Sequence, residues 1–373
     1  MDRRSRVFMI MVVLIILIVS LSVYYIINTQ NGYDKNTIQG PSIPSVISTS
    51  FNRSFTDLLD QYGNTGKGWT GSDGTYSLQL SNGSVLWIFS DTFLGQVSNC
   101  SRNLSDSPLV HNTLVLEWGN SFGPTYYSEI NGSPEGYFSP QSSLYWYWPG
   151  FAIIYNSDIQ VILTEYTRSG SGPFDFKQIG TSVGVINETS LKLIGIYPLN
   201  LSNEVNWAAF SVRSNGYTYI YGVNGGSVCL ARTSEGLLGN WQFYSNGNWS
   251  NNQANHTEIL FGVDESFGVT YLNGYYILIT ESGLSFNSGI IQFYYSSYPC
   301  GPFDGGYTIY NITTPLKYPS SYKVYSYNAM IQPEFTHNNT LLVSYNVNAE
   351  NYSALSNASI YRPRFINVNL SFD

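Results

Sequence analysis

The sequence predicts an all-β protein, a five-bladed β-propeller that follows a single N-terminal transmembrane helix. Three observations support this prediction: an apolar run near the N-terminus, a hairpin pattern that recurs five times, and a nearly even spacing between its copies. We expect residues 51–373 to form the propeller. Residues 28–50 are rich in Asn, Gly, Pro, Ser and Thr and lack apolar periodicity, so they are expected to form an extended extracytoplasmic linker.

The predicted transmembrane helix spans residues 7–27, which contain no charged residue. An α-helix of about 20 residues rises about 30 Å, enough to cross the hydrocarbon core of a bilayer. Arginines precede this run, and no Lys or Arg follows it until Lys35. The positive-inside rule therefore predicts a cytoplasmic tail over residues 1–6 and a single-pass protein of the cell membrane with an extracellular body. A cleaved signal peptide is the alternative, but no clear small-x-small cleavage site follows the run.

An exterior location also agrees with the N-x-S/T sequons, which accept N-linked glycans in exported proteins. Fourteen such triplets begin at Asn52, Asn82, Asn99, Asn103, Asn131, Asn187, Asn200, Asn248, Asn255, Asn311, Asn338, Asn351, Asn357 and Asn369. Because Asn, Ser and Thr are abundant in this chain, some of these triplets arise by chance. The sequons therefore support a glycoprotein outside the cell and say nothing about its activity.

Charged residues make up 11% of the chain, compared with about 25% in a typical globular protein, whereas Tyr alone contributes 32 residues. A net charge of −8 without a cluster of Lys and Arg argues against nucleic-acid binding. The low charge also suggests the hypothesis of an acidic exterior, in which carboxylates are protonated.

The three Cys and three His residues are scattered along the chain. No zinc site is therefore predicted, and at most one intrachain disulfide is expected.

Five hairpins are predicted from turns centred on Asn residues at positions 82, 156, 215, 273 and 338, which are 74, 59, 58 and 65 residues apart. A short apolar stretch precedes each turn, and a strand of alternating aromatic or β-branched residues follows it. Asn and Gly accept the positive φ angles that tight hairpin turns require. The intervals match the length of a four-stranded propeller blade, whereas a β-sandwich, the competing prediction, would not explain the even spacing.

The first hairpin carries a pair of carboxylates. If Asn82 and Gly83 form a two-residue turn, the numbers of opposed residues sum to 165, which sets Gly74 opposite Asp91. Asp73 and Asp91 then emerge at the same end of the hairpin, although strict pleating would point them to opposite faces of the sheet. Paired carboxylates hydrolyse glycosidic bonds: one protonates the leaving oxygen and the other activates water or attacks the sugar. Both residues are therefore predicted to be catalytic.

Polar residues recur at equivalent positions of the other hairpins, about nine residues before or after each turn. In a propeller these positions converge around the axis, where polar groups bind sugar hydroxyls and indoles stack on sugar rings. The substrate-binding residues predicted in this way are Trp148, Glu165, Asn206, Trp207, Asp264, Glu265, Glu281 and Asn346. Each polar position alone is also explained as a turn former. No cofactor is predicted, although the ring of oxygen ligands suits an axial Ca²⁺.

Three segments of the first hairpin region carry a family resemblance: residues 68–77 (GWTGSDGTYS), 86–95 (LWIFSDTFLG) and 110–113 (VHNT). They resemble a superfamily of secreted five-bladed propellers whose characterised branch is the endo-D-arabinofuranase type of glycoside hydrolase. The resemblance continues through segments 146–150, 170–174, 217–222, 299–303, 332–334 and 344–348. It implies an inverting mechanism with two Asp that match Asp73 and Asp91.

The same resemblance adds His111, Asn112, Gln332 and Glu334 to the expected substrate-binding residues. Two positions depart from the pattern: many relatives have an acidic residue where this chain has Phe151, and His where it has Gln332. Either change is able to alter the substrate or to remove activity. The arabinan substrate is not transferred to this chain, because related propellers cleave differing furanosides or other glycans and a shared fold does not fix the substrate.

These observations predict a membrane-anchored extracellular glycoside hydrolase-like protein that cleaves or binds polysaccharides or glycoprotein glycans of the cell surface. We assign Asp73 as the general base and Asp91 as the general acid. The sequence does not decide between this assignment and its reverse. Glu265 and Glu281 are the alternatives for the acid. The competing hypothesis is a non-catalytic surface propeller, an adhesin or envelope component that binds glycans or proteins.

Overall fold

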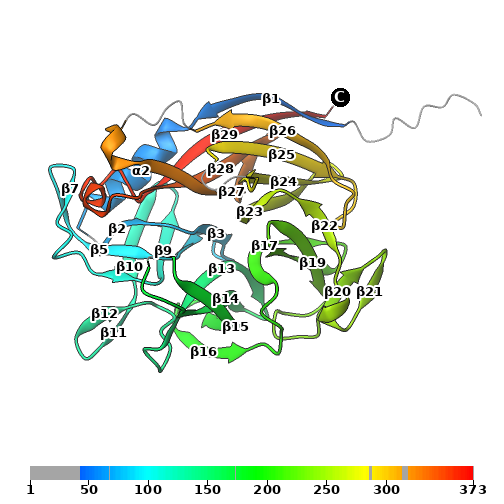
Figure 1. Cartoon of the computed structure of the whole chain (residues 1–373), viewed down its shortest axis with the longest axis horizontal. Helices are drawn as coiled ribbons and strands as arrows, with labels where there is room; N and C mark the ends of the chain where they lie inside the picture. The colour runs from blue at the N-terminus through cyan, green and yellow to red at the C-terminus, as the bar shows by residue number, and fades with distance from the viewer. Residues whose placement is uncertain (1–42, 67, 173, 285–287, 313–317, 373) are drawn as a thin grey trace, which may run out of the picture. The chain divides into compact units, whose positions relative to one another are not determined.

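The computed structural model describes residues 43–372 except for 67, 173, 285–287 and 313–317. The predicted cytoplasmic tail, the predicted transmembrane helix and linker residues 28–42 lie outside the described residues. Strands dominate the described part, and α2 (Arg53–Gly63) is its only α-helix (Figure 1). Within those same residues, no helix has the length and apolar character needed to cross a membrane.

Five antiparallel sheets of four or more strands follow one another along the described chain (Figure 1). The first sheet has the order β10 (Ser121–Tyr126), β9 (Thr113–Trp118), β4 (Val85–Phe89), β3 (Thr75–Gln79). The second has β13 (Tyr145–Tyr155), β14 (Asp158–Arg168), β15 (Phe176–Asn187), β16 (Leu193–Pro198). The third has β17 (Asn206–Ser214), β18 (Tyr217–Asn224), β19 (Ser227–Thr233), β20 (Gln242–Ser245), β21 (Asn248–Ser250), with β22 (Glu258–Phe261) also pairing with β19.

The fourth sheet has the order β23 (Val263–Leu272), β24 (Tyr275–Ser282), β25 (Ile290–Ser296), β26 (Asp304–Asn311). The fifth has β27 (Val324–His337), β28 (Thr340–Ala349), β29 (Pro363–Phe372), β1 (Pro44–Phe51). Smaller sheets are formed by β2 (Gly68–Ser72), β5 (Thr92–Gly95) and β8 (Leu109–Val110), by β6 (Val97–Ser98) and β7 (Ser101–Arg102), and by β11 (Ser128–Ile130) and β12 (Ser133–Glu135). Short 3₁₀ helices are η1 (Gln253–Asn255), η2 (Ser320–Tyr322) and η3 (Tyr352–Ser356).

The inner strands of the five sheets form a closed ring. β3 contacts β13, β13 contacts β17, β17 contacts β23, β23 contacts β27, and β27 returns to β3. Figure 1 shows the sheets radiating from this ring. Apolar side chains such as Leu86, Leu163 and Ile220 fill the space between neighbouring sheets and are fully buried. The predicted all-β, propeller-like architecture is therefore confirmed.

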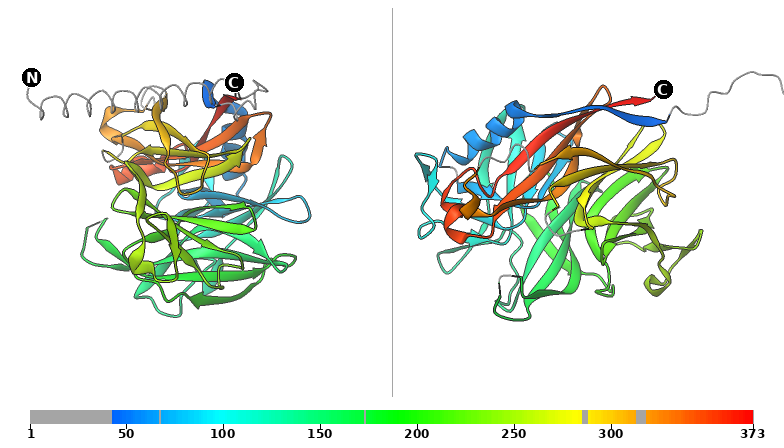
Figure 2. Two further views of the ribbon diagram at one scale, coloured as in Figure 1. Left: turned by 90° about the vertical axis from the view of Figure 1, so that its right-hand side faces the viewer. Right: turned by 45° about the horizontal axis from the view of Figure 1, so that its top comes forward.

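The fifth sheet contains strands from both ends of the described chain. β1 pairs with β29 from Pro44 opposite Phe372 to Phe51 opposite Ile366, and Figure 2 shows the two strands running side by side. The prediction of a linker as far as residue 50 is thus wrong for residues 44–50, which belong to the folded body. Composition misled here because β1 is the edge strand of its sheet, and half of its eight residues are Ser or Thr.

Four of the five predicted turns have the expected two-residue geometry. Their turn residues have positive φ angles and are Asn156 and Ser157, Asn215 and Gly216, Asn273 and Gly274, and Asn338 and Asn339. The flanking residues pair directly across each turn, as for Ser214 with Tyr217 and for Leu272 with Tyr275. These features define type I′ hairpin turns, whose twist matches that of the strands.

The first hairpin has a longer turn than predicted. Leu80 N donates to Ser84 O at 2.8 Å and Gly83 N donates to Leu80 O at 2.9 Å, so three residues, 81–83, form the loop. Thr75 consequently pairs with Phe89 and Gln79 with Val85, and the numbers of opposed residues sum to 164 instead of 165. The predicted register is wrong by one residue, and the corrected register sets Asp73 opposite Asp91.

Each inner strand of the second to fifth sheets contains a bulge at a similar level. Two or three of its residues oppose one residue of the neighbouring strand: 150–151 oppose 162, 207–209 oppose 222, 264–266 oppose 281, and 328–329 oppose 345. Bulges redirect side chains and are common beside binding sites. In the fourth and fifth sheets they bring Asp264, Glu265 and Asn328 to the lining of a central cavity.

Several predicted sequons are explained by local turn chemistry. The Ser hydroxyl two residues later donates to the Asn side-chain oxygen in four of them, at Asn82, Asn103, Asn351 and Asn357, over 2.6 to 2.9 Å. The backbone N–H of the same Ser also donates to that oxygen. Asn and Ser favour such turns whether or not a glycan is attached, so these triplets are weak evidence for glycosylation.

Candidate active site

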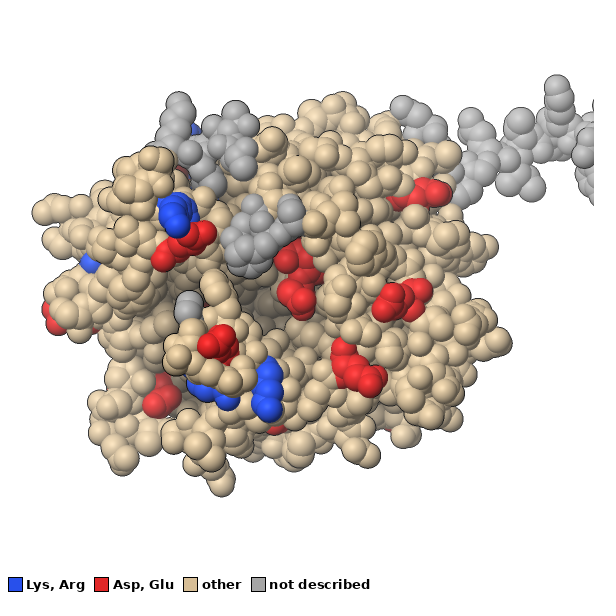
Figure 3. All heavy atoms as spheres, in the orientation of Figure 1, with Lys and Arg blue, Asp and Glu red and all other residues tan. Residues whose placement is uncertain are grey.

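A cavity of about 1150 Å³ lies at the centre of the five sheets. Figure 3 shows it as a hollow in the face viewed in Figure 1. Every sheet or its flanking loop contributes lining residues, for example Asp73, Trp148, Asn206, Glu281 and Tyr327. Because it is larger than most small-molecule pockets, which occupy about 300 to 1000 Å³, it suits an extended ligand.

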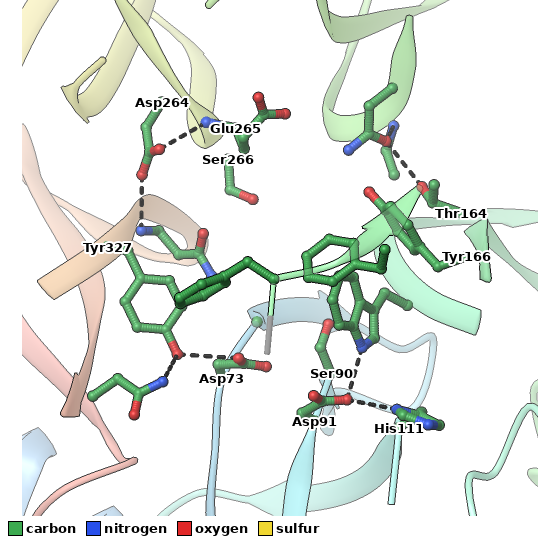
Figure 4. Close-up of a pocket in the computed structure, with 18 of the residues that line it drawn as sticks. Asp73, Ser90, Asp91, His111, Thr164, Tyr166, Asp264, Glu265, Ser266 and Tyr327 are labelled. Carbon is green, nitrogen blue, oxygen red and sulfur yellow. Dashed lines mark hydrogen bonds and ion pairs between the residues drawn. The ribbon is translucent and has the colours of Figure 1, made fainter. Parts of the chain in front are cut away.

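Asp73 and Asp91 lie where the ladder of the first hairpin passes from one sheet to the next. The ladder of β3 and β4 continues into β2 and β5 in the same register, with Ser72 paired to Thr92. At the junction, Asp73 N donates to Asp91 O at 3.0 Å and Ser90 N donates to Asp73 O at 2.9 Å. Both side chains line the cavity, and Figure 4 shows them next to each other. The corrected register thus removes the objection from strict pleating.

Gly74 allows the chain to bend at this junction. Its φ angle is 53°, and a Cβ atom at this position would lie 2.4 Å from Ser90 Oγ. A side chain here would meet both a left-handed backbone and a steric clash, so glycine is required. The Asp-Gly pair in the sequence is the signal for this bend.

The Asp73 carboxyl is enclosed and has two different oxygens. Tyr327 and Tyr361 donate their hydroxyls to its Oδ2 atom at 3.0 and 3.1 Å. Burial raises the pKa of Asp73 to about 8, the neighbouring Asp91 carboxyl adds to this rise, and the two tyrosine hydrogen bonds oppose it. A backbone hydrogen bond from Asp91 also opposes the rise. Both side-chain donors share Oδ2, so the proton of the neutral acid is placed on Oδ1.

The Asp91 carboxylate is held by nitrogen donors. Trp148 Nε1 donates to Asp91 Oδ1 at 2.7 Å, and His111 Nδ1 lies 2.9 Å from the same oxygen. The His111 ring in turn stacks on Trp146 with the ring centres 5.0 Å apart, which fixes its orientation. Both contacts are made to one oxygen, which leaves the Oδ2 atom of Asp91 for another partner.

Six of the predicted substrate-binding residues line the cavity together with the two Asp: His111, Trp148, Asn206, Asp264, Glu265 and Glu281. Figure 4 shows Asp264 and Glu265 across the cavity from Asp91. Burial raises the pKa of all three carboxyls among them, and that of Glu281 to about 7. Asp264 accepts hydrogen bonds from Glu265 N and Asn328 N, and Glu281 accepts from Gly289 N and Ser326 Oγ.

Three of the other predicted residues are buried amides that join elements of the fold, and they do not line the cavity. Asn112 donates to Phe138 O and Tyr147 O and accepts from Phe138 N. Gln332 Nε2 donates to Thr75 O at 2.8 Å, and Asn346 Nδ2 donates to Thr75 Oγ1 at 3.1 Å. The bonds of Gln332 and Asn346 connect the fifth sheet to the first, and those of Asn112 connect the first hairpin region to the second sheet. The three amides therefore stabilise the ring.

The remaining three predicted residues also lie away from the cavity lining. Trp207 is fully buried and packs against Trp241 and Phe243. Glu165 accepts a hydrogen bond from Ser182 Oγ, and Glu334 accepts one from Ser77 Oγ. Glu165 and Glu334 are therefore polar because they form hydrogen bonds within and between sheets.

Two residues of the site, Tyr327 and Tyr361, are absent from the sequence-based prediction. Tyr361 has a φ angle of 65°, a left-handed conformation that is strained for a residue with a side chain. Tyr is so abundant in this chain that neither position stands out in the sequence.

An axial Ca²⁺ would take oxygen ligands from the residues that line the cavity. Among the acidic, His and Cys side chains of the described residues, no group of three or more is arranged to hold a metal ion. The cavity carboxyls instead accept hydrogen bonds from nearby N–H and O–H groups.

The fold and the cavity together define an all-β, propeller-like protein with two adjacent Asp side chains in a central, partly aromatic cavity. The chain belongs to the family described as Domain of unknown function (DUF5005), whose profile matches residues 56–370. No curated protein matches it in sequence.

Solved structures are similar to this chain at low sequence identity, and the similarity of the first of the three named here shows the shared fold. A "putative hydrolase" from Bacteroides ovatus is 18% identical with a TM-score of 0.74, covering 90% of this chain and 97% of that one. An exo-β-1,3-galactanase from Phanerochaete chrysosporium, solved with β-1,3-galactotriose, is 15% identical with a TM-score of 0.47 and coverages of 81% and 62%. An α-L-arabinofuranosidase from Podospora anserina, in complex with cellotriose, is 10% identical with a TM-score of 0.49 and coverages of 82% and 93%.

Proposed function

We propose that this protein is a glycoside hydrolase with a five-bladed propeller, in which Asp73 is the general acid and Asp91 the general base of an inverting mechanism. One observation carries the proposal: two directly opposed carboxyls face one cavity in different environments. Burial favours the neutral form of Asp73, which suits a proton donor, whereas Asp91 accepts a hydrogen bond from Trp148 Nε1 and contacts His111 Nδ1, which suits a proton acceptor. Such a difference is what assigns an acid and a base in carbohydrate-cleaving sites.

The proposed chemistry follows from the free oxygen of each carboxyl. Asp73 Oδ1 gives its proton to the glycosidic oxygen as the bond to the anomeric carbon breaks. Asp91 Oδ2 takes a proton from the water molecule that attacks this carbon from the opposite face. The assignment from the sequence had Asp73 as the general base and Asp91 as the general acid, and the proposal exchanges these two roles. Phe151 and Gln332, the two departures from the family pattern, are buried and do not line the cavity, which supports retained activity.

The substrate and location belong to the same proposal. We infer a glycan of the cell surface, because a helix at residues 7–27 would hold the body close to the membrane. The kinship with the endo-D-arabinofuranase type remains part of the proposal and does not select the sugar.

Single substitutions test the two roles. In Asp73→Asn and Asp91→Asn variants, we expect kcat/KM on a hydrolysed glycan to fall about 10²- to 10⁴-fold. An aryl glycoside with an activated leaving group needs little protonation, so it should restore much of the rate of Asp73→Asn and none of the rate of Asp91→Asn. Asp158→Asn, at a turn remote from the cavity, is the control. The anomer of the first product, followed by NMR, tests inversion.

Two results would contradict the proposal. Unchanged hydrolysis in both Asn variants would remove the catalytic assignment. Tight glycan binding without turnover by the wild-type chain across a broad glycan panel would favour the non-catalytic surface protein instead.

A further inference from the structure

The cavity wall formed by the second sheet is aromatic. The Trp148 ring centre lies 4.6 Å from that of Tyr166 and 4.9 Å from that of Phe176. Trp146 packs against the same group and also stacks on His111. Phe174, in the loop between β14 and β15, is exposed at the cavity lining. This wall therefore offers ring faces on which a sugar stacks.

Two cations line the cavity near this aromatic wall, Arg168 at the end of β14 and Lys177 near the start of β15. The Arg168 guanidinium lies 5.5 Å from the centre of the Trp146 ring, and its Nη1 donates to Gly172 O at 3.3 Å. These contacts orient the guanidinium and leave most of its N–H donors open. No described carboxylate oxygen lies within 4 Å of either cation, although Glu204 also lines the cavity.

Other described cations have partners or lie away from the cavity. Lys323 pairs with Glu350, Arg362 and Arg364 pair with Asp60, and Arg102 is buried against backbone and hydroxyl groups. Most cavity carboxyls lie in the first hairpin region and on the fourth sheet, and Glu204 and Glu350 also line the cavity. Figure 3 shows blue atoms at the edge of the hollow, with red atoms both beside them and across it. In a chain with few charges, two cations at one wall of the cavity without a described carboxylate oxygen within 4 Å indicate a ligand with an anionic group at that wall.

We propose that Arg168 and Lys177 bind an anionic group of the glycan, either the carboxylate of a uronic acid or a sulfate ester. The inference rests on the proposed function, because it assigns the substrate class of the same cavity. A guanidinium binds planar oxygen pairs in a bidentate manner, and a lysine adds a point charge. Arg168 and His111 each contact the Trp146 ring, and His111 contacts Asp91. The anionic group therefore binds beside the position of bond cleavage and not at it.

Binding to matched polymers tests the proposal. The full-length chain carrying Asp91→Asn, to prevent cleavage, is titrated with polygalacturonate and its methyl ester, and with dextran sulfate and dextran. We expect the charged member of one pair to bind at least about tenfold more tightly than its neutral partner, because hydrogen bonds to charged groups are strong. The pair that shows the larger preference identifies the carboxylate or the sulfate ester. Non-specific attraction is disfavoured, since the chain has a net charge of −8.

Substitutions locate the preference. Arg168→Gln with Lys177→Gln should lower the charged-to-neutral ratio by about tenfold or more, and Arg168→Lys should lower it partly because a point charge remains. Lys192→Gln with Arg213→Gln removes the same charge from exposed positions outside the cavity lining and should leave the ratio unchanged. Both pairs are exposed, so thermal melting is expected to show intact folds.

Equal binding of charged and neutral polymers, or an equal loss of preference in the Lys192 and Arg213 control, would overturn the proposal. Its failure is distinguishable from failure of the proposed function. Charge preference without hydrolysis of any glycan would retain the anionic subsite and reject the hydrolase. Hydrolysis of neutral glycans without charge preference would do the reverse.

Discussion

At the scale of single residues, the cavity treats two identical side chains differently. Both side-chain hydrogen bonds to Asp73 come from hydroxyls that share one oxygen, while the contacts of Asp91 Oδ1 are with ring nitrogens, Trp148 Nε1 as a donor and His111 Nδ1 at 2.9 Å. The hydroxyls lower the pKa of Asp73, but burial outweighs them and the group stays neutral below about pH 8. Tyr361 acts through Asp73 and is a positioning residue, and its left-handed backbone shows that the fold holds it there under strain.

Tyr361→Phe removes one of these donors without changing the size of the side chain. Loss of the hydrogen bond should raise the pKa of Asp73 further, because that bond favours the charged form. If Asp73 is the acid, it must be protonated, so activity falls as the pH rises through its pKa. The basic limb of the kcat/KM profile should therefore move to higher pH, by up to about one unit for one hydrogen bond to a charged group.

The control for this profile is Tyr298→Phe, an exposed tyrosine outside the cavity lining. A basic limb that stays in place in Tyr361→Phe, or moves equally in the control, would show that Asp73 does not set it.

At the scale of elements, the first hairpin shows what makes the pair of carboxylates adjacent. Two sheets meet at Gly74, and the bend between them points both Asp side chains into the cavity. Gly83 also has a left-handed backbone, with a φ angle of 85°, yet no atom lies within 4 Å of where its Cβ would be. Gly83 therefore shows the effect of a left-handed backbone alone, whereas Gly74 combines a left-handed backbone with a steric clash.

Gly83→Ala should cost about 1 to 2 kcal/mol of unfolding free energy, the cost of a left-handed residue with a Cβ atom. Gly74→Ala adds a clash with Ser90 and should cost about 1 to 3 kcal/mol more. It should also lower kcat/KM about 100-fold by displacing Asp73, while Gly83→Ala leaves kcat/KM unchanged. Chemical denaturation and steady-state kinetics on both variants check this. Equal costs in the two variants would rule out the clash.

The elements also show which parts of the fold could be predicted from the sequence. Alternating strands and Asn turns were sufficient to predict the five hairpins, because their geometry is encoded locally. The register of the first hairpin could not be predicted in this way, because a two-residue and a three-residue loop both fit the segment Ser81-Asn82-Gly83. The bulges that bring Asp264 and Glu265 to the cavity have no local signal. Buried amides such as Gln332 and Asn346 resemble ligand-binding residues in sequence, because contacts between distant sheets give them their role.

At the scale of the whole molecule, closure of the ring places many carboxyls where water is scarce. Burial raises the pKa of six of them, Asp73, Glu117, Asp264, Glu265, Glu281 and Glu334. Glu117 illustrates the cause away from the cavity: it is buried, accepts a hydrogen bond from Trp87 Nε1 at 2.6 Å, and has its pKa raised to about 7. The protein is thus built to hold neutral acids, which agrees with the hypothesis of an acidic exterior.

These shifts fix the sign of the pH dependence of stability. A carboxyl whose pKa is higher in the folded than in the unfolded chain stabilises the fold below its ordinary pKa, near 4, and loses this contribution as the pH rises through the folded value. The folded values are about 7 for Glu117 and Glu281 and about 8 for Asp73, so the unfolding temperature should fall between pH 4 and pH 8. In Glu117→Gln, which resembles the neutral acid, this fall should be smaller by on the order of 2 °C, whereas Glu129→Gln, at an exposed carboxylate, should match the wild type. Calorimetry of the full-length chain across this range measures it, and an unfolding temperature that is flat or rises toward pH 8 would contradict both the buried neutral carboxyls and the acidic exterior that they suggest.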